Sequence, residues 1–171
     1  MPGLHSAFHE EREEEDFSRL IIHVICFGNL WQGADGFGVR VFQRLCDRSD
    51  WPAHVKVFEA GTAGLAALDY FEGCSKVVIV DALKTGGAPG RVSRLALDEI
   101  DLPDEAYSLH QLGVNHLLTA MKAAFAGRDT PEVVVIGAEV GEIDPFTDRL
   151  CPALEAALEP VVGLIINECA N

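Results

Sequence analysis

Two aspartates and one histidine have the side-chain types of a small metal-binding or acid–base site. Asp35 lies in a glycine-rich turn, residues 28–38, that contains this one carboxylate and no lysine, a composition that points away from phosphate binding. Asp81 follows four apolar residues, and His110 stands in the segment Ser108-Leu109-His110-Gln111-Leu112-Gly113. Two carboxylate oxygens and an imidazole nitrogen are an incomplete ligand set for a borderline divalent ion, which leaves positions for water or substrate.

The elements expected around these residues place them at one edge of a sheet. Residues 20–27 are an apolar run that predicts a buried strand, and residues 37–46 carry apolar side chains at helical spacing. Asp81 lies near the end of a second buried strand at residues 76–82, and His110 precedes a helix predicted over residues 114–126. Since α/β proteins hold their sites at the carboxyl ends of parallel strands, we expect Asp35, Asp81 and His110 to converge there.

Strand and helix signals alternate along the rest of the chain. Strands are predicted over residues 55–59, 91–95 and 132–137. Helices are predicted over residues 62–68, with Thr62 as the N-cap, and from Pro152 through Ile165. An irregular connection is expected over residues 98–109 and a loop over residues 139–149. Helices between continuous apolar strands indicate an α/β fold. We expect a three-layer α/β/α sandwich with a mostly parallel twisted sheet and helices on both faces.

Length and charge limit the domain organisation and the partners. The 171 residues predict an acidic flexible leader at residues 1–18, rich in glutamate, and a single domain at residues 19–171. No apolar run reaches the roughly 18 residues of a membrane helix, and the leader is too polar for a signal peptide, so a cytoplasmic protein is expected. The net charge of −14 argues against a nucleic-acid partner, because phosphate binding needs clustered lysine and arginine. The acidic surface also favours a monomer that meets one partner transiently.

Structural roles compete with these chemical ones. Asp81 could instead accept a hydrogen bond from the turn that follows it, and His110 could be a surface or capping residue. Glu139, just past a predicted strand, could join the same edge of the sheet or stay outside the site. The five cysteines are scattered without C-x-x-C spacing, and Cys26 is expected to be a small core residue. The sequence contains no phosphate loop, no G-x-S-x-G elbow, no G-x-G-x-x-G turn after the first strand and no H-E-x-x-H motif.

The order and spacing of these segments resemble those of the nickel–iron hydrogenase maturation endopeptidases, over about residues 21–166. The residues that carry the resemblance are Gly28-Asn29-Leu30, Asp35-Gly36-Phe37-Gly38-Val39-Arg40, Gly61-Thr62-Ala63-Gly64, Val80-Asp81-Ala82, Gly87-Ala88-Pro89-Gly90, Ser108-Leu109-His110-Gln111-Leu112-Gly113 and Ile136-Gly137. The resemblance makes residues 19–171 a peptidase domain. It implies removal of a C-terminal extension from the precursor of the hydrogenase large subunit after nickel delivery.

The resemblance also assigns roles to residues. Asp35, Asp81 and His110 fall on the metal-contacting positions of the family, so they would recognise nickel that the substrate supplies and carry the catalysis. Whether the metal activates the peptide or a carboxylate acts as general base stays open. Ala34 and Glu59 depart from the pattern, since many relatives have an acidic residue and an aspartate at these positions; the catalytic role of Glu59 is therefore in doubt.

Two other functions are compatible with parts of this pattern. One is a non-catalytic nickel checkpoint or chaperone that binds the large subunit without cutting it. The other is a flavodoxin-like nucleotide binder, which shares the predicted fold but would need a phosphate loop. A change in the mass of the substrate distinguishes cleavage from binding alone.

Overall fold

A five-stranded sheet forms the centre of the structure, a computed structural model that describes residues 21–100, 109–143 and 145–170, with the backbone alone at residues 109–113. The strands are β1 (Ile22–Phe27), β2 (Val55–Gly61), β3 (Lys76–Leu83), β4 (Val92–Ala96) and β5 (Glu132–Glu139), in the spatial order β2-β1-β3-β5-β4. The first four in this spatial order pair in parallel, and β4 pairs with β5 in antiparallel orientation. The predicted α/β class and mostly parallel sheet are confirmed.

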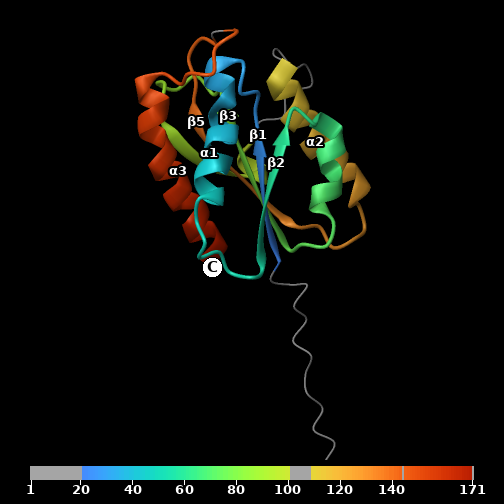
Figure 1. Cartoon of the computed structure of the whole chain (residues 1–171). Helices are drawn as coiled ribbons and strands as arrows, with labels where there is room; N and C mark the ends of the chain where they lie inside the picture. Colours follow the sequence, from blue (N-terminus) through green and yellow to red (C-terminus); the bar gives the residue numbers. More distant parts are fainter. Residues whose placement is uncertain (1–20, 101–108, 144, 171) are drawn as a thin grey trace, which may run out of the picture.

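Helical segments cover both faces of this sheet (Figure 1). On one face lie α1 (Phe37–Cys46) and α3 (Pro152–Ala170), which contact each other. On the other lie α2 (Leu109–Ala124) and the 3-10 segment η3 (Gly64–Phe71). Two short 3-10 segments, η2 (Gly33–Gly36) and η4 (Leu97–Glu99), complete the described elements.

Alternate residues of the central strands supply two separate cores, one on each face of the sheet. Val24 and Val78 pack with the α1 and α3 side chains, and Ile25 and Ile79 pack with those of α2 and η3. Because both faces are covered, every residue of β1 is buried, which explains why five of its six residues are apolar. The exception is His23, whose Nδ1 lies within hydrogen-bond distance of the carbonyl oxygen of Tyr70, at 2.7 Å.

Several predicted boundaries and one predicted cap differ from the structure. The helix expected from residue 114 already begins at Leu109, and the strand expected to end at Gly137 continues to Glu139. Thr62 is not an N-cap: Gly61 and Gly64 adopt φ of 51° and 53°, so the chain turns before η3 begins. Ala63 occupies the capping position without a side-chain hydrogen bond. The acidic leader and most of the 98–109 connection lie outside the described residues.

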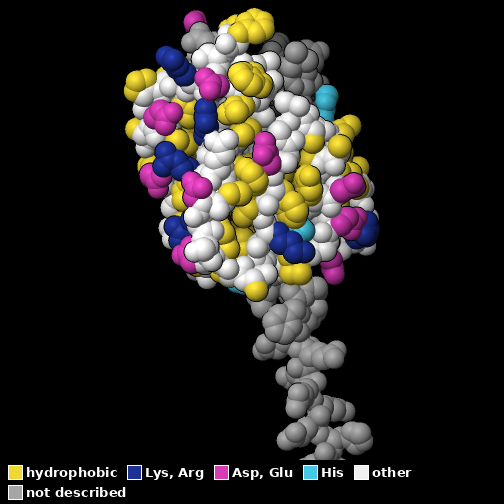
Figure 2. Space-filling model, viewed as in Figure 1, with side chains coloured by type: hydrophobic (Ala, Val, Ile, Leu, Met, Phe, Trp, Pro, Cys, Tyr) yellow, Lys and Arg dark blue, Asp and Glu magenta, His cyan; other side chains and the backbone are white. Residues whose placement is uncertain are grey.

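The strand β2 forms one edge of the sheet and, in the described part of the chain, pairs with β1 alone. Lys56 and Glu59 on this strand are exposed. Figure 2 shows apolar side chains in a band down this face, interrupted by charged ones. No helix within the described ranges is long and apolar enough to cross a membrane.

Candidate functional site

The turn between β1 and α1 folds Asp35 back over the end of β1. Asp35 is in η2 with only 1% of its surface exposed, and its Oδ2 accepts a hydrogen bond from the backbone N–H of Asn29 at 2.8 Å. Gly28, directly after β1, has φ of 141°, and a Cβ there would lie 2.3 Å from the carbonyl oxygen of Asp35. A side chain at position 28 is therefore excluded by backbone conformation and by contact.

The start of α1 lies unusually close to the sheet. A Cβ on Gly38 would stand 2.0 Å from the carbonyl oxygen of Phe27 and 2.9 Å from that of Val80. Only glycine lets the helix approach the ends of β1 and β3 this closely, and this approach sets the position of η2 and Asp35 above β3.

Asp81 lies near the carboxyl end of β3, between β1 and β5. Its Oδ1 accepts a hydrogen bond from the N–H of Ala82 at 2.8 Å, and 9% of its surface is exposed. The pKa of this carboxyl is raised from 3.8 to about 7. Burial raises it most, the hydrogen bond from Ala82 lowers it, and the negative charge of Asp35 raises it. The structure thus brings Asp35 and Asp81 close enough to interact electrostatically, at the edge of the sheet where the sequence placed them.

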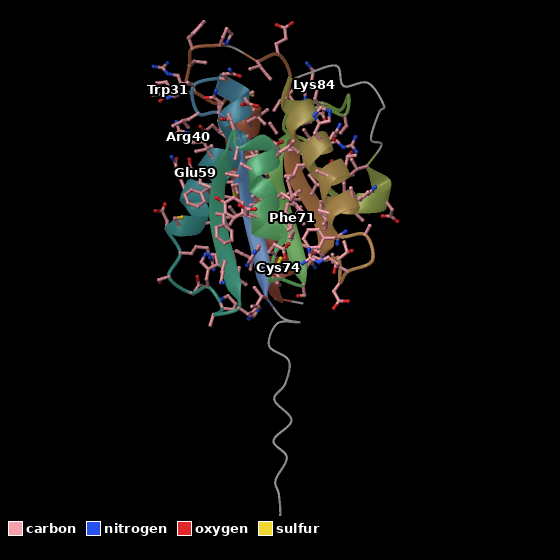
Figure 3. All side chains as sticks on the ribbon, turned by 90° about the vertical axis from the view of Figure 1, so that its right-hand side faces the viewer. Trp31, Arg40, Glu59, Phe71, Cys74 and Lys84 are labelled. Atoms are coloured by element: carbon pink, nitrogen blue, oxygen red, sulfur yellow. The ribbon has the colours of Figure 1, made fainter. Side chains whose placement is uncertain are left out.

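His110 lies in the first turn of α2, which begins at the same end of the molecule as the carboxyl ends of the strands (Figure 1). Trp31 and Lys84, which follow β1 and β3, mark this end in Figure 3, whereas Cys74 lies toward the opposite end. The side chain of His110 is outside the described part of the chain, so its convergence with the two aspartates stays a prediction. Among the described residues, no three histidine, cysteine, aspartate or glutamate side chains form a metal-binding group.

Glu139 is an anchor for the turn after β3. Its side chain, with 2% of the residue exposed, accepts hydrogen bonds from the N–H of Thr85 at 2.7 Å, the hydroxyl of Thr85 at 2.7 Å and the N–H of Gly86 at 2.8 Å. These three donors occupy both oxygens of the carboxylate. The structural alternative for Glu139, which the sequence left open, is therefore supported.

Replacing Glu139 with alanine should lower the free energy of unfolding by about 1–3 kcal/mol, because three hydrogen bonds from Thr85 and Gly86 to a buried acceptor are lost. Urea unfolding followed by circular dichroism measures this change. Glu142→Ala, on an exposed residue of the same loop, is the control and should change stability by less than about 0.5 kcal/mol. Equal stability of the two variants would contradict the anchoring role.

The three other residues considered in the sequence are an exposed glutamate, a buried cysteine and a buried alanine. Glu59 is exposed on the edge strand β2, in register with Cys26 of β1. Cys26 is fully buried, and burial raises the pKa of its thiol far above the usual range, which makes the thiol unreactive. Ala34 is buried within the α1–α3 core, where an acidic side chain would lose its hydration.

Asn29 belongs to the Gly28-Asn29-Leu30 motif, but the sequence assigned it no role in the site. Besides the N–H bond to Asp35, its side-chain Oδ1 accepts a hydrogen bond from the N–H of Trp31 at 3.1 Å. An asparagine directly after a glycine in a strand-to-helix turn is a typical residue for such local bonds, and this signal could have identified it.

Comparisons with known proteins agree with this arrangement. A model of the hydrogenase maturation protease family matches residues 39–168. The chain is 31% identical over 152 residues to the hydrogenase expression/formation protein HoxM of Azotobacter vinelandii, covering 88% of this chain and 72% of that protein. It is 29% identical over 147 residues to the hydrogenase 2 maturation protease of Escherichia coli, covering 85% and 88%.

Solved structures of similar fold bear similar names. The hydrogenase maturating endopeptidase HybD from E. coli superimposes with a TM-score of 0.73 at 26% identity, covering 86% of this chain and 91% of that one. The hydrogenase 2 maturation peptidase of a Thaumarchaeota archaeon gives a TM-score of 0.63 at 33% identity, covering 86% and 97%. The resemblance seen in the sequence is thereby confirmed, and the chain belongs to the hydrogenase maturation protease family, whose members are peptide hydrolases.

Proposed function

We propose that this chain removes a C-terminal extension from the precursor of a nickel–iron hydrogenase large subunit once nickel has been inserted. The observation that carries the proposal is the pair of buried carboxylates, Asp35 and Asp81, at the carboxyl edge of the sheet in a chain of this family. Burying two carboxylates side by side lowers the stability of the fold, because both lose their hydration. Such pairs are typical of sites that bind a substrate or a cation.

Nickel enters this proposal as part of the substrate. Asp35 and Asp81 would offer oxygen ligands, and His110, from the first turn of α2, would offer an imidazole nitrogen. Imidazole and carboxylate groups suit a borderline divalent ion, and thiolates of the precursor would complete the ligand set. Cleavage would then depend on nickel insertion, since the enzyme alone supplies too few ligands to hold the ion tightly.

Two roles for the carboxylates follow from this placement. They hold the precursor by its metal, which orients the scissile peptide at the ends of β1 and β3. One of them can also take a proton from the attacking water, as a general base. The two roles are compatible, because a carboxylate that would bind the ion through one oxygen keeps its second oxygen to accept a proton.

The test compares two forms of one substrate. Purified protein is incubated with nickel-loaded and with nickel-free large-subunit precursor from the organism that encodes the chain, and the intact mass of each precursor is measured. We expect loss of a short C-terminal peptide from the loaded precursor alone. Equal cleavage of both forms would support the protease activity and contradict its dependence on nickel. Binding without a change in mass would favour the non-catalytic checkpoint.

A further inference from the structure

Two aromatic side chains project into solvent beside the candidate site. Trp31, in the turn after β1, has 69% of its surface exposed, and Phe146, in the loop after β5, has 95% exposed. With Leu65 at 57%, they are the exposed large hydrophobic residues of the described part of the chain. Trp31 is labelled at the end of the molecule that holds the carboxyl ends of the strands (Figure 3).

The two aromatic residues belong to segments that are joined by backbone hydrogen bonding. Gln32 and Thr147 form an isolated parallel bridge, and the N–H of Gly33 donates to the carbonyl of Thr147 at 2.7 Å. Trp31 and Phe146 each precede a bridged residue, so they start from neighbouring positions on the two segments. The sequence did not predict this proximity, because the two residues are far apart in the chain.

Both segments are fixed in place by further polar contacts. The N–H of Trp31 donates to the side chain of Asn29, whose own N–H donates to Asp35. On the other segment, Arg40 of α1 donates to the carbonyl of Asp148 at 2.8 Å and pairs with its carboxylate at 3.7 Å. The two aromatic residues are therefore exposed on segments whose backbone is held in place by hydrogen bonds.

Phe146 also has a strained backbone conformation. Its φ of 64° is the one positive value among the described residues other than glycine. For a bulky side chain this conformation costs about 1–3 kcal/mol, and such residues cluster at ligand clamps and active sites. A strained backbone that holds a phenyl ring in water is unfavourable to folding in both respects, which points to a role in binding.

We propose that Trp31 and Phe146 form an aromatic docking site for an apolar segment of the large-subunit precursor next to the scissile bond. The inference rests on the proposed function. The occupant follows from continuity with the site: two hydrogen bonds, through Asn29, connect the backbone of Trp31 to the carboxylate of Asp35. A chain seated on the aromatic pair thus lies beside the residues proposed to hold its metal. Exposed tryptophan and phenylalanine are also the residue types enriched in the cores of protein interfaces.

The test separates binding from chemistry in four variants: Trp31→Ala, Phe146→Gly, Trp31→Phe and Leu65→Ala. Processing of the nickel-loaded precursor gives KM and kcat, and interferometry with the immobilised precursor gives Kd. We expect Trp31→Ala and Phe146→Gly to raise KM and Kd about 10-fold or more, with kcat within about twofold of the wild type. Trp31→Phe should restore most of the affinity, and Leu65→Ala, on the α2 side of the sheet, should change nothing.

Phe146→Gly distinguishes docking from a structural role. Glycine adopts positive φ freely, so this variant should unfold at a urea concentration equal to or above that of the wild type while it binds the precursor more weakly. Unchanged KM and Kd in both aromatic variants would overturn the docking site. A similar loss in Leu65→Ala would also overturn it, since binding would then follow exposed apolar area in general.

The same measurements separate this inference from the function on which it rests. If the wild type leaves the precursor uncut, the proposed function fails, and the Kd values alone then decide the docking site. If the wild type cuts and the variants cut with unchanged KM, the docking site alone fails. Light scattering of the wild type tests the other occupant, a second copy of the chain: a dimer that Trp31→Ala dissociates would overturn the assignment to the precursor.

Discussion

The Asp81→Asn variant is expected to lose precursor processing while it folds more stably than the wild type at neutral and higher pH. The activity should fall at least about 100-fold, because the substitution removes a negatively charged ligand or proton acceptor from the candidate site. Asparagine has nearly the same shape and can still accept the hydrogen bond from Ala82, so the fold is preserved. His110→Ala should cause a comparable loss of processing if the proposed three-residue site is correct.

The stability gain has a defined pH dependence. The pKa of Asp81 is raised from 3.8 to about 7 by burial and by Asp35, so the folded state keeps a proton that the unfolded state releases above about pH 4. The contribution of Asp81 to the stability of the metal-free wild type therefore falls as pH rises from about 4 to about 7 and then levels off. Asparagine lacks this titration, so the advantage of the variant should grow over the same interval, to about 4 kcal/mol.

Urea unfolding at a series of pH values measures this difference. Asp50→Asn, on an exposed aspartate paired with Arg48, is the matched control and should differ from the wild type by less than about 0.5 kcal/mol at every pH. If Asp81→Asn proves less stable than the wild type at pH 8, the carboxylate contributes to folding and its interpretation as a costly functional group is wrong.

Gly38→Ala should produce the largest loss of stability. The added methyl group would lie 2.0 Å from the carbonyl oxygen of Phe27 and 2.9 Å from that of Val80, and both are backbone atoms of the sheet. The start of α1 would have to move away from β1 and β3, at a cost of about 3 kcal/mol or more. Processing should fall as well, since η2 and Asp35 move with the helix.

Gly163→Ala provides the opposite result in the same measurement. Gly163 lies within α3, and a Cβ there would meet no atom within 4 Å. Alanine should therefore raise the free energy of unfolding by about 0.5–1 kcal/mol, through its better helix propensity. Equal effects of the two substitutions would show that contact with the sheet does not determine the role of Gly38.

The fold could be predicted largely from the sequence because its central strands are buried on both faces. The apolar runs of β1 and β3 predict strands in the middle of a parallel sheet that is covered on both faces. The ends of elements were less predictable. Leu109 to Gly113 joined α2 without a strong periodic signal, and two glycines in left-handed conformation delayed the start of η3.

The sequence predicted the location of the candidate site, at the carboxyl ends of the parallel strands, but not its contacts. Asp35 follows one apolar strand and Asp81 lies near the end of another, and the rule for parallel sheets brought them to one end. What the sequence did not predict depends on contacts between distant segments. The three hydrogen bonds that occupy Glu139 come from the turn after a different strand, and the bridge between Gln32 and Thr147 joins two loops without a shared sequence pattern.

The outer edge of β2 is unpaired in the described part of the chain, and this has a consequence for the behaviour of the protein at high concentration. An unpaired strand edge offers N–H and C=O groups to which a strand from another molecule can add, and such addition is a route to aggregation. Lys56 and Glu59 are exposed on this strand, so a second molecule that extended the sheet would have to desolvate both charges. The charge of Glu59 therefore opposes the addition of a strand from another molecule, an effect that does not involve catalysis.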